Sequence, residues 1–106
     1  MEKVQLNITP NQTVKVILNG QNCQLKIYYR FGKMYLDLIC NNNVIQQGAV
    51  CTNRSAIIQK ETNNFAGNLF FVDLLGDTDP TYQGFGNRYS LLYVGANEDI
   101  PRGFLP

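Results

Sequence analysis

Histidine and tryptophan are both absent from this chain of 106 residues, and charged side chains are few. The absence of histidine excludes Ser–His and Cys–His nucleophile pairs, imidazole acid–base catalysis and most zinc or iron ligand sets. An enzyme built on this chain would have to rely on carboxylate, lysine or tyrosine side chains. We therefore expect no enzymatic activity, no cofactor and no metal site.

Charge is low and nearly balanced, since charged residues make up 16% of the chain and the formal net charge is +1. The nine basic residues are scattered singly, whereas a nucleic-acid footprint needs a clustered basic face that neutralises phosphates. No apolar run approaches the roughly 20 residues that a membrane span needs. The chain opens with Glu2-Lys3 and then alternates, so no signal peptide is expected. Nucleic acid is therefore not expected as the main partner, and no membrane span is predicted.

Amides replace part of the missing charge, in runs such as Asn41-Asn42-Asn43 and Gln46-Gln47. Amides lose less than charges on desolvation, so such a surface suits contacts with other proteins. A compositional bias toward Asn codons would explain the same runs equally well. The three cysteines, Cys23, Cys40 and Cys51, are odd in number and lack C-x-x-C spacing, so we predict buried thiols and no disulfide framework.

Alternation of apolar and polar residues, which is typical of strands, recurs along the first half of the chain, and no segment sustains the helical period. The alternating segments are Val4–Ile8, Val14–Leu18, Cys23–Arg30, Met34–Cys40 and Val44–Val50. Asn19-Gly20 marks a tight hairpin, because both central positions of a type I′ turn need positive φ. The last four segments are joined by turns too short for a parallel crossover, so they predict an antiparallel meander.

The second half of the chain continues the strand pattern with longer loops. Ala56–Gln59 is a candidate short strand, followed by a polar loop at Lys60–Gly67. Leu69–Leu75 is nearly continuously apolar, as expected of a strand that is covered on both faces. A loop rich in glycine, aspartate and proline, Gly76–Gly86, leads into the last clear strand, Tyr89–Val94.

These segments together predict an all-β fold with about seven to eight strands. The expected architecture is a single small antiparallel β-sandwich or barrel. We assign this β-domain to residues 1–94. Residues 95–106 contain two prolines and two glycines with little alternation, and are expected to form an extended C-terminal tail.

One carboxylate cluster, Asp73, Asp77 and Asp79, permits a calcium loop or an acid–base pair as interpretations. Its spacing does not fit an EF-hand, which needs ligands at alternate positions and a distal glutamate. Aspartate and glycine are also the residues that turns prefer, because their side chains hydrogen-bond to the local backbone. We therefore favour a structural loop over a metal or catalytic site.

Aromatic residues gather in two places. Gly84-Phe85-Gly86 lacks the third glycine and the following helix of a phosphate-binding loop. It instead indicates a sharp turn that fixes the direction of the Tyr82 and Phe85 side chains. The second group surrounds the hairpin that turns at Phe31-Gly32-Lys33, and it consists of Tyr28, Tyr29, Phe31 and Tyr35. Alternation sends Tyr29 to the core and leaves Tyr28 on the other face. Exposed aromatic side chains serve as interface anchors, although pairing of Tyr28 across the strands of one sheet would explain its placement as well.

The order of motifs along the chain is more specific than any one of them. Between residues 4 and 94 they are Pro10-Asn11-Gln12, Asn19-Gly20, Gly48-Ala49-Val50-Cys51 before Asn53-Arg54, Gly67-Asn68-Leu69-Phe70-Phe71-Val72-Asp73, and Tyr82-Gln83-Gly84-Phe85-Gly86-Asn87-Arg88-Tyr89-Ser90-Leu91-Leu92-Tyr93. In this order and spacing they resemble the baseplate plug family of contractile-tailed bacteriophages, first defined from a cyanophage baseplate. The sequence departs from that pattern at Phe85, where an aliphatic residue is usual between the two glycines.

This resemblance implies a structural virion protein of the tail baseplate, made in the cytoplasm of the bacterial host. It would plug or organise the central hub near the end of the tail tube and help to hold the state before contraction. The implied partners are other baseplate, hub and tail-tube proteins, with oligomerisation inside the assembly. Candidate interface residues are Tyr28, Tyr35, Arg54, Tyr82, Phe85 and Arg88. For Arg88, an ion pair with Asp73 or Asp79 within the chain is the alternative.

Three other functions stay open. The first is another small β virion protein, such as a tail-tube terminator or a head–tail connector. The second is a carbohydrate-binding β-domain that uses tyrosine and aspartate at the loop ends, against which the missing tryptophan argues. The third is a hydrolase built on Asp73, Asp77 and Asp79.

Overall fold

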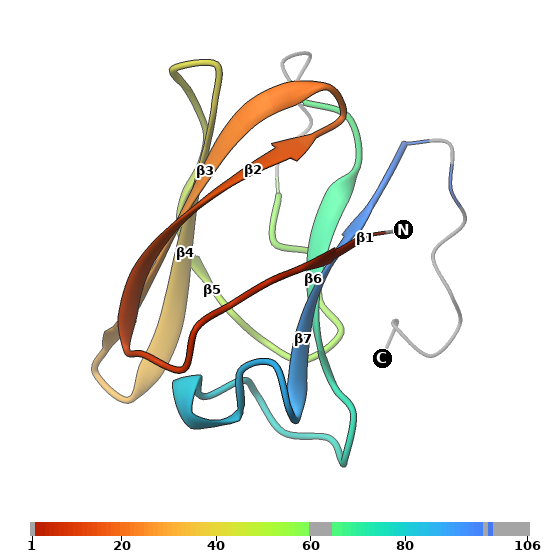
Figure 1. Cartoon of the computed structure of the whole chain (residues 1–106). Coiled ribbons are helices and arrows are strands. Elements are labelled where there is room, and N and C mark those ends of the chain that lie inside the picture. The colour runs from red at the N-terminus through yellow and green to blue at the C-terminus, as the bar shows by residue number, and fades with distance from the viewer. Residues whose placement is uncertain (1, 60–64, 97, 99–106) are drawn as a thin grey trace.

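The computed structural model describes residues 2–59, 65–96 and 98. In this part of the chain, seven strands and one short 3-10 turn form two antiparallel sheets that face each other (Figure 1). The strands are β1 (Glu2–Val4), β2 (Asn11–Leu18), β3 (Gln21–Arg30), β4 (Lys33–Cys40), β5 (Asn43–Val50), β6 (Asn68–Asp73) and β7 (Tyr89–Val94), and the turn is η1 (Tyr82–Gly84). The sheets are not closed into a barrel, so the sandwich is the correct one of the two predicted architectures.

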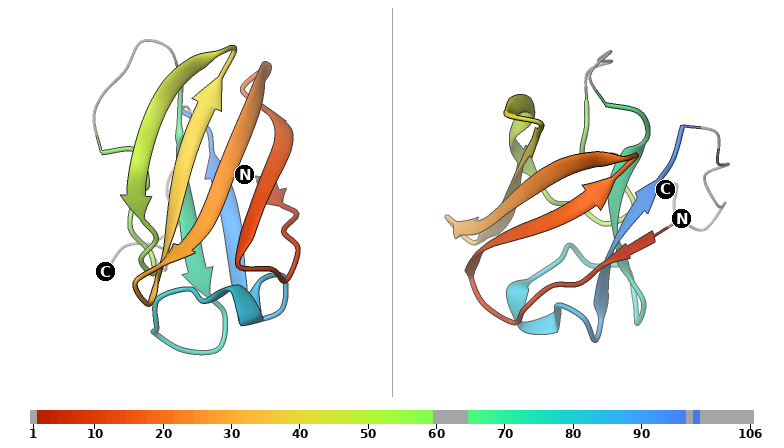
Figure 2. Two further views of the ribbon diagram at one scale, coloured as in Figure 1. Left: turned by 90° about the vertical axis from the view of Figure 1, so that its left-hand side faces the viewer. Right: turned by 45° about the horizontal axis from the view of Figure 1, so that its top comes forward.

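The first sheet is the predicted meander, with strand order β2-β3-β4-β5 (Figure 2). Two residues connect each neighbouring pair of strands, as the pairings of Leu18 with Gln21, Arg30 with Lys33 and Cys40 with Asn43 show. All six connecting residues have positive φ: Asn19 and Gly20, Phe31 and Gly32, Asn41 and Asn42. Positive φ at both central positions is the requirement of a type I′ turn, which confirms the hairpin predicted at Asn19-Gly20.

A single hydrophobic core fills the space between the two sheets. Its inward side chains include Leu25, Ile27, Leu36 and Leu38 from the first sheet and Leu69, Phe71 and Leu91 from the second. Full burial of such a side chain stabilises the fold by about 1.5–3 kcal/mol. The alternation predicted along β3 and β4 is therefore confirmed over most of both strands.

Tyr29 is the exception to that alternation. It has the core-facing parity of β3, yet 48% of the residue is exposed. The expectation that it lies in the core is wrong, because Tyr29 stands near the last residue of the strand. Its ring packs edge-to-face with the ring of Tyr82, with the two centroids 6.0 Å apart, instead of against the opposite sheet.

The second sheet has the order β1-β7-β6, and its strand β6 is buried at five consecutive residues, 69–73. This burial of both parities confirms the expected strand that is covered on both faces. The strand ends at Asp73, two residues earlier than predicted, since Leu74 and Leu75 are exposed. The side chain of Asp73 accepts hydrogen bonds from the N–H groups of Leu75 and Thr78, which turns the chain away from the sheet.

Two further expected strands differ from the structure. The N-terminal strand ends at Val4 instead of Ile8, because the Gln12 side chain forms hydrogen bonds with the backbone of Asn7. Its Oε1 accepts from the Asn7 N–H over 3.0 Å, and its Nε2 donates to the Asn7 carbonyl over 2.8 Å. The segment at 56–59 is not a strand, and instead crosses the outer edge of β6 with one bridge between Ala56 and Phe70.

The described residues close with a short turn after β7. Gly95 donates its backbone N–H to the carboxylate of Glu98, and Glu98 donates its own to the Gly95 carbonyl. The rest of the expected extended tail, and residues 60–64 of the expected polar loop, lie outside the described residues. The three cysteines are free and buried, as predicted.

Candidate interaction surface

The outer face of the four-stranded sheet carries a stacked pair of tyrosines. Tyr28 on β3 and Tyr35 on β4 are directly opposite each other, with ring centroids 5.8 Å apart and an interplanar angle of 19°. Cross-strand pairing therefore explains the placement of Tyr28, and both rings remain half-buried. Arg30 extends this stack, since its guanidinium carbon lies 5.3 Å from the centre of the Tyr28 ring.

Asp37 holds the tyrosine pair in position. The Tyr28 hydroxyl donates to Asp37 Oδ1 over 3.0 Å, and the backbone N–H of Gly48 on β5 donates to the same oxygen over 2.6 Å. Burial, and then the hydrogen bond to Asp37, raise the pKa of Tyr28 above its usual value. Three strands thus fix one aromatic surface of defined orientation.

Tyr82 and Phe85, which the sequence placed together on one sharp turn, have opposite environments. Tyr82 begins η1, stays partly exposed and packs its ring against Tyr29. Phe85 is only 1% exposed and stacks on Phe71, with centroids 5.6 Å apart. The expectation of an outward-facing Phe85 is therefore corrected: its side chain belongs to the core, because the turn after η1 directs it between the sheets.

Arg88 forms the intramolecular ion pair that the sequence offered as its alternative role. Its Nε and one terminal nitrogen donate to the two carboxylate oxygens of Asp73, both at 2.8 Å. The hydrogen bonds from Arg88 and from Thr78 hold the pKa of Asp73 well below its usual range. With both oxygens occupied and the side chain ionised, Asp73 is poorly suited to transfer a proton.

The other two aspartates of the cluster tie the same loop to Asn53. The Asn53 side chain donates to Asp77 over 2.9 Å, and its backbone N–H donates to Asp79 over 3.1 Å. The structural interpretation of the cluster is thus confirmed in its hydrogen bonds. Within residues 2–59, 65–96 and 98, no group of three potential metal ligands is found.

Arg54 lies on the segment beside β6, while the other candidate residues lie on β3, β4 and the chain from η1 to β7. It has a positive φ of 60°, and its backbone N–H donates to the Phe71 carbonyl over 2.8 Å. Its side-chain Nε is buried and has no hydrogen-bond partner among the described residues. The structure therefore brings Tyr28 and Tyr35 together, and Tyr82 beside Tyr29, but does not make one cluster of all six candidates.

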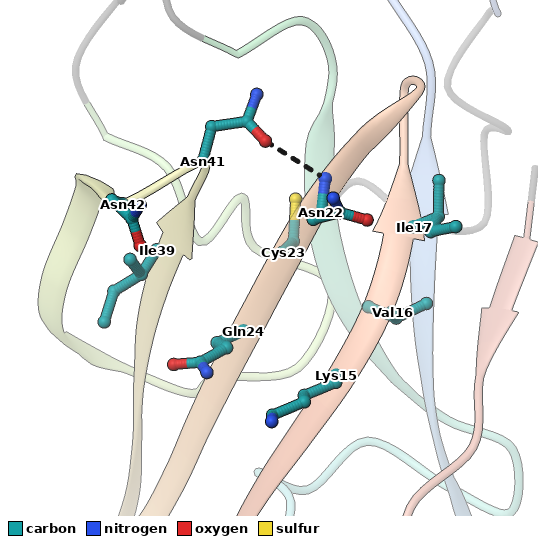
Figure 3. A pocket seen from close by; sticks show the side chains of 9 residues that line it. All are labelled: Lys15, Val16, Ile17, Asn22, Cys23, Gln24, Ile39, Asn41 and Asn42. Carbon is teal, nitrogen blue, oxygen red and sulfur yellow. Dashed lines mark hydrogen bonds between the residues drawn. The ribbon is translucent and has the colours of Figure 1, made fainter.

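A depression of about 620 Å³ lies on the same outer face toward the opposite end of the sheet (Figure 3). Lys15 and Ile17 of β2, Asn22 and Gln24 of β3, and Ile39 and Asn41 of β4 and its turn are among its lining residues. The backbone N–H of Asn22 donates to the Asn41 side chain over 3.3 Å at its rim. Sequence reasoning missed this surface, although the side chains that alternate with the core residues of β2–β4 were the signal for it.

Phe31 is the other feature that sequence reasoning did not select as an interface candidate. Phe31 belongs to the aromatic group predicted around this hairpin and was not among the interface candidates, yet it projects from the turn with 91% of its surface exposed. The detectable signal was a phenylalanine at the first position of a two-residue turn, where asparagine or glycine is the usual choice.

Comparison with known protein families identifies the family of this small β-domain. The described residues contain no helix that is both long and apolar enough to span a membrane. No curated protein matches the chain. Residues 1–97 match the protein family described as "Cyanophage baseplate Pam3 plug gp18", which covers nearly all of the 106 residues. The chain therefore belongs to this baseplate plug family and is a structural component of a phage tail baseplate.

Proposed function

We propose that this protein is a non-enzymatic subunit that plugs or organises the central hub of the baseplate, at the end of the tail tube. The observation that carries this proposal is the family match over residues 1–97. Its partners would be hub, baseplate and tail-tube proteins, bound through protein–protein contacts. It would be made in the cytoplasm of the bacterial host and become oligomeric inside the assembly.

The edge of the four-stranded sheet supports a role built on protein contacts. Strand β2 pairs with β3 on one side, and no other described strand pairs with it on the outer side. It is eight residues long and regular, and Ile17 near its end is 63% exposed. A free edge of this kind is an aggregation hazard in an isolated protein, whereas a strand from a neighbour completes it in an assembly.

The mechanism that follows is mechanical. Many modest interfaces that are closed by symmetry make the assembled state stable, although each alone is weak. In the state before contraction this subunit would bridge its neighbours at the centre of the baseplate. Movement of those neighbours on receptor binding would break a subset of the contacts and release the tube.

Quantitative mass spectrometry of purified particles tests the proposal. Peptides of this chain should occur at a fixed, low copy number beside the hub and sheath proteins. Infectious particles without any such peptide would overturn the structural role. Binding of the isolated domain to a glycan array would then be the measurement for the carbohydrate alternative.

A further inference from the structure

The three hairpin turns of the four-stranded sheet share one backbone geometry but not one sequence. The first turn residue has a φ of 54° at Asn19, 53° at Phe31 and 49° at Asn41. Each turn consists of two residues, and in all three hairpins the residues that flank the turn are paired across the strands. The sheet therefore provides two internal references against which the turn at Phe31 can be judged.

Phenylalanine is unfavourable at this position of the turn. An L-residue with a Cβ atom is strained in the left-handed region, whereas asparagine tolerates it because its short polar side chain hydrogen-bonds to the local backbone. Burial does not offset the strain, since 91% of Phe31 is exposed. A strained residue that gains nothing from the isolated fold points to a function outside that fold.

The surroundings of Phe31 define the chemistry of this tip. Arg30 and Lys33 are the paired residues on either side of the turn, and both are exposed. Neither has an acidic partner in the described part of the chain, although Arg30 stacks on the Tyr28 ring. Behind them Tyr29, which is 48% exposed, packs on Tyr82. The tip thus presents one exposed apolar side chain, Phe31, between two cationic side chains, with the Tyr29–Tyr82 ring pair packed behind them.

We propose that this tip, residues 30–33, is the anchor by which the protein docks on another baseplate protein. Its partner would offer an apolar pocket for Phe31 with aspartate or glutamate at the rim, facing Arg30 and Lys33. This inference rests on the proposed function and adds the contact surface and the chemistry of the partner. Desolvated aromatic anchors dominate the binding energy of interfaces, and flanking charges set orientation and association rate.

Two depressions on the surface of the described residues do not offer such a pocket to a second copy of the chain. The depression near the Asn19-Gly20 turn is lined by Lys15 and the one beside β2 and β3 by Lys26, and neither has a carboxylate in its lining. Both therefore lack the acidic rim that a cationic tip requires. The tip also lies at the opposite end of the sheet from the other two hairpin turns (Figure 1), so it projects free of them.

The decisive variant is Phe31→Asn, which copies the turn residue of the other two hairpins. It should raise the Tm of the isolated protein by roughly 4–8 °C, because strain is relieved and no buried contact is lost. A phage that lacks its own copy of the gene is grown in a host that expresses wild type and variant equally. Their ratio in purified particles is then measured from non-tryptic peptides that span position 31. We expect the variant to be at least about tenfold depleted.

Matched variants separate the anchor from general surface effects. Phe31→Tyr keeps the aromatic ring and should be incorporated close to the wild-type level. Leu75→Asn makes the same kind of change at another side chain that is 78% exposed, and should not be depleted. Lys33→Glu should lower incorporation, while Lys3→Glu, an equal charge change at an exposed residue of β1, should not.

The outcomes are distinguishable. Absence of the wild-type chain from infectious particles overturns the proposed function, and this inference with it. Equal incorporation of wild type and Phe31→Asn overturns the anchor alone, as does equal depletion of Leu75→Asn. Equal incorporation together with Phe31-dependent binding to phosphatidylglycerol vesicles would replace the protein partner by an anionic membrane surface.

Discussion

Two phenylalanines of this chain occupy opposite environments. Phe31 is 91% exposed, whereas Phe85 is 1% exposed and stacks on Phe71. Phe85→Ala should therefore lower the free energy of unfolding by about 3–5 kcal/mol, because it removes a buried ring and leaves a cavity. Urea unfolding followed by circular dichroism measures this loss.

The same substitution at the exposed position is the matched control. Phe31→Ala removes no buried area and leaves the φ of the turn unchanged, so the free energy of unfolding should change by less than about 0.5 kcal/mol. A loss at Phe85 no greater than that at Phe31 would contradict the placement of Phe85 in the core.

The cysteines make a second residue-scale prediction. Burial raises the pKa of Cys51 to about 12, and burial likewise raises the pKa of Cys40. All three thiols are buried, and only an accessible thiolate reacts. The folded protein should therefore not react with a thiol reagent at pH 8 within the time that the denatured protein reacts completely. Titration with a chromogenic disulfide should detect no thiol in the native protein and three thiols in the denatured protein. Rapid reaction of a native thiol would show that the fold opens locally.

At the scale of elements, the ion pair between Asp73 at the end of β6 and Arg88 before β7 links stability to pH. The pKa of Asp73 is held well below its ordinary value of 3.8. Between about pH 5 and that lowered pKa the unfolded chain binds a proton that the folded chain does not. The contribution of Asp73 is thus complete above this range and is lost as the pH falls through it.

Thermal melts between pH 7 and pH 2 measure this contribution. Asp73→Asn should lower the Tm at pH 7 and flatten the decline of the Tm on the acid side, because the variant lacks the carboxylate whose protonation is coupled to unfolding. Glu2→Gln, at an exposed residue of β1, retains Asp73 and should keep the steep decline. If the slopes of Asp73→Asn and wild type were equal, Asp73 would not be the group that couples stability to acid.

Local patterns determined how well each element could be predicted. The β2–β5 meander was predictable because two-residue turns and strict alternation act over a few residues, as the buried Leu36 and Leu38 show. The placement of Phe85 was not, because its contact with Phe71 joins residues that are distant in the sequence. The prediction for Tyr29 failed for a related reason. Alternation predicts on which face of a strand a side chain lies, but not how far the opposite sheet extends to cover it.

The end of β1 and the path of the segment after β5 depend on side-chain hydrogen bonds that no periodicity in the sequence reveals. Gln12 ends β1 early by bonding to Asn7, and Asn53 links the segment after β5 to the loop at Asp77. Among the candidate site residues, the Tyr28–Tyr35 pair followed from strand register, since a two-residue turn fixes which side chains face each other. Arg54 could not be related to the others before the long-range pairing with β6 was known.

At the scale of the whole molecule, one core joins both sheets. Tyr89 and Tyr93 of the second sheet are buried in the same cluster as Leu25 and Leu36 of the first. We therefore expect the domain to unfold in a single cooperative transition. Urea transitions followed by far-ultraviolet circular dichroism and by tyrosine fluorescence should coincide. Separate midpoints would show that the two sheets come apart independently.

The edges of the sheets differ in a way that limits how the protein can assemble. The outer edge of β6 is occupied, since Phe71 and Leu69 accept backbone hydrogen bonds from Arg54 and Ile57. On β5 the register shifts, and β1 has only three residues. Strand β2 is then the one long, regular edge among the described strands. For strand pairing, in the terms of polymer chemistry, such a unit is monofunctional: it can accept one added strand at β2 and offers no second long, regular edge among the described strands.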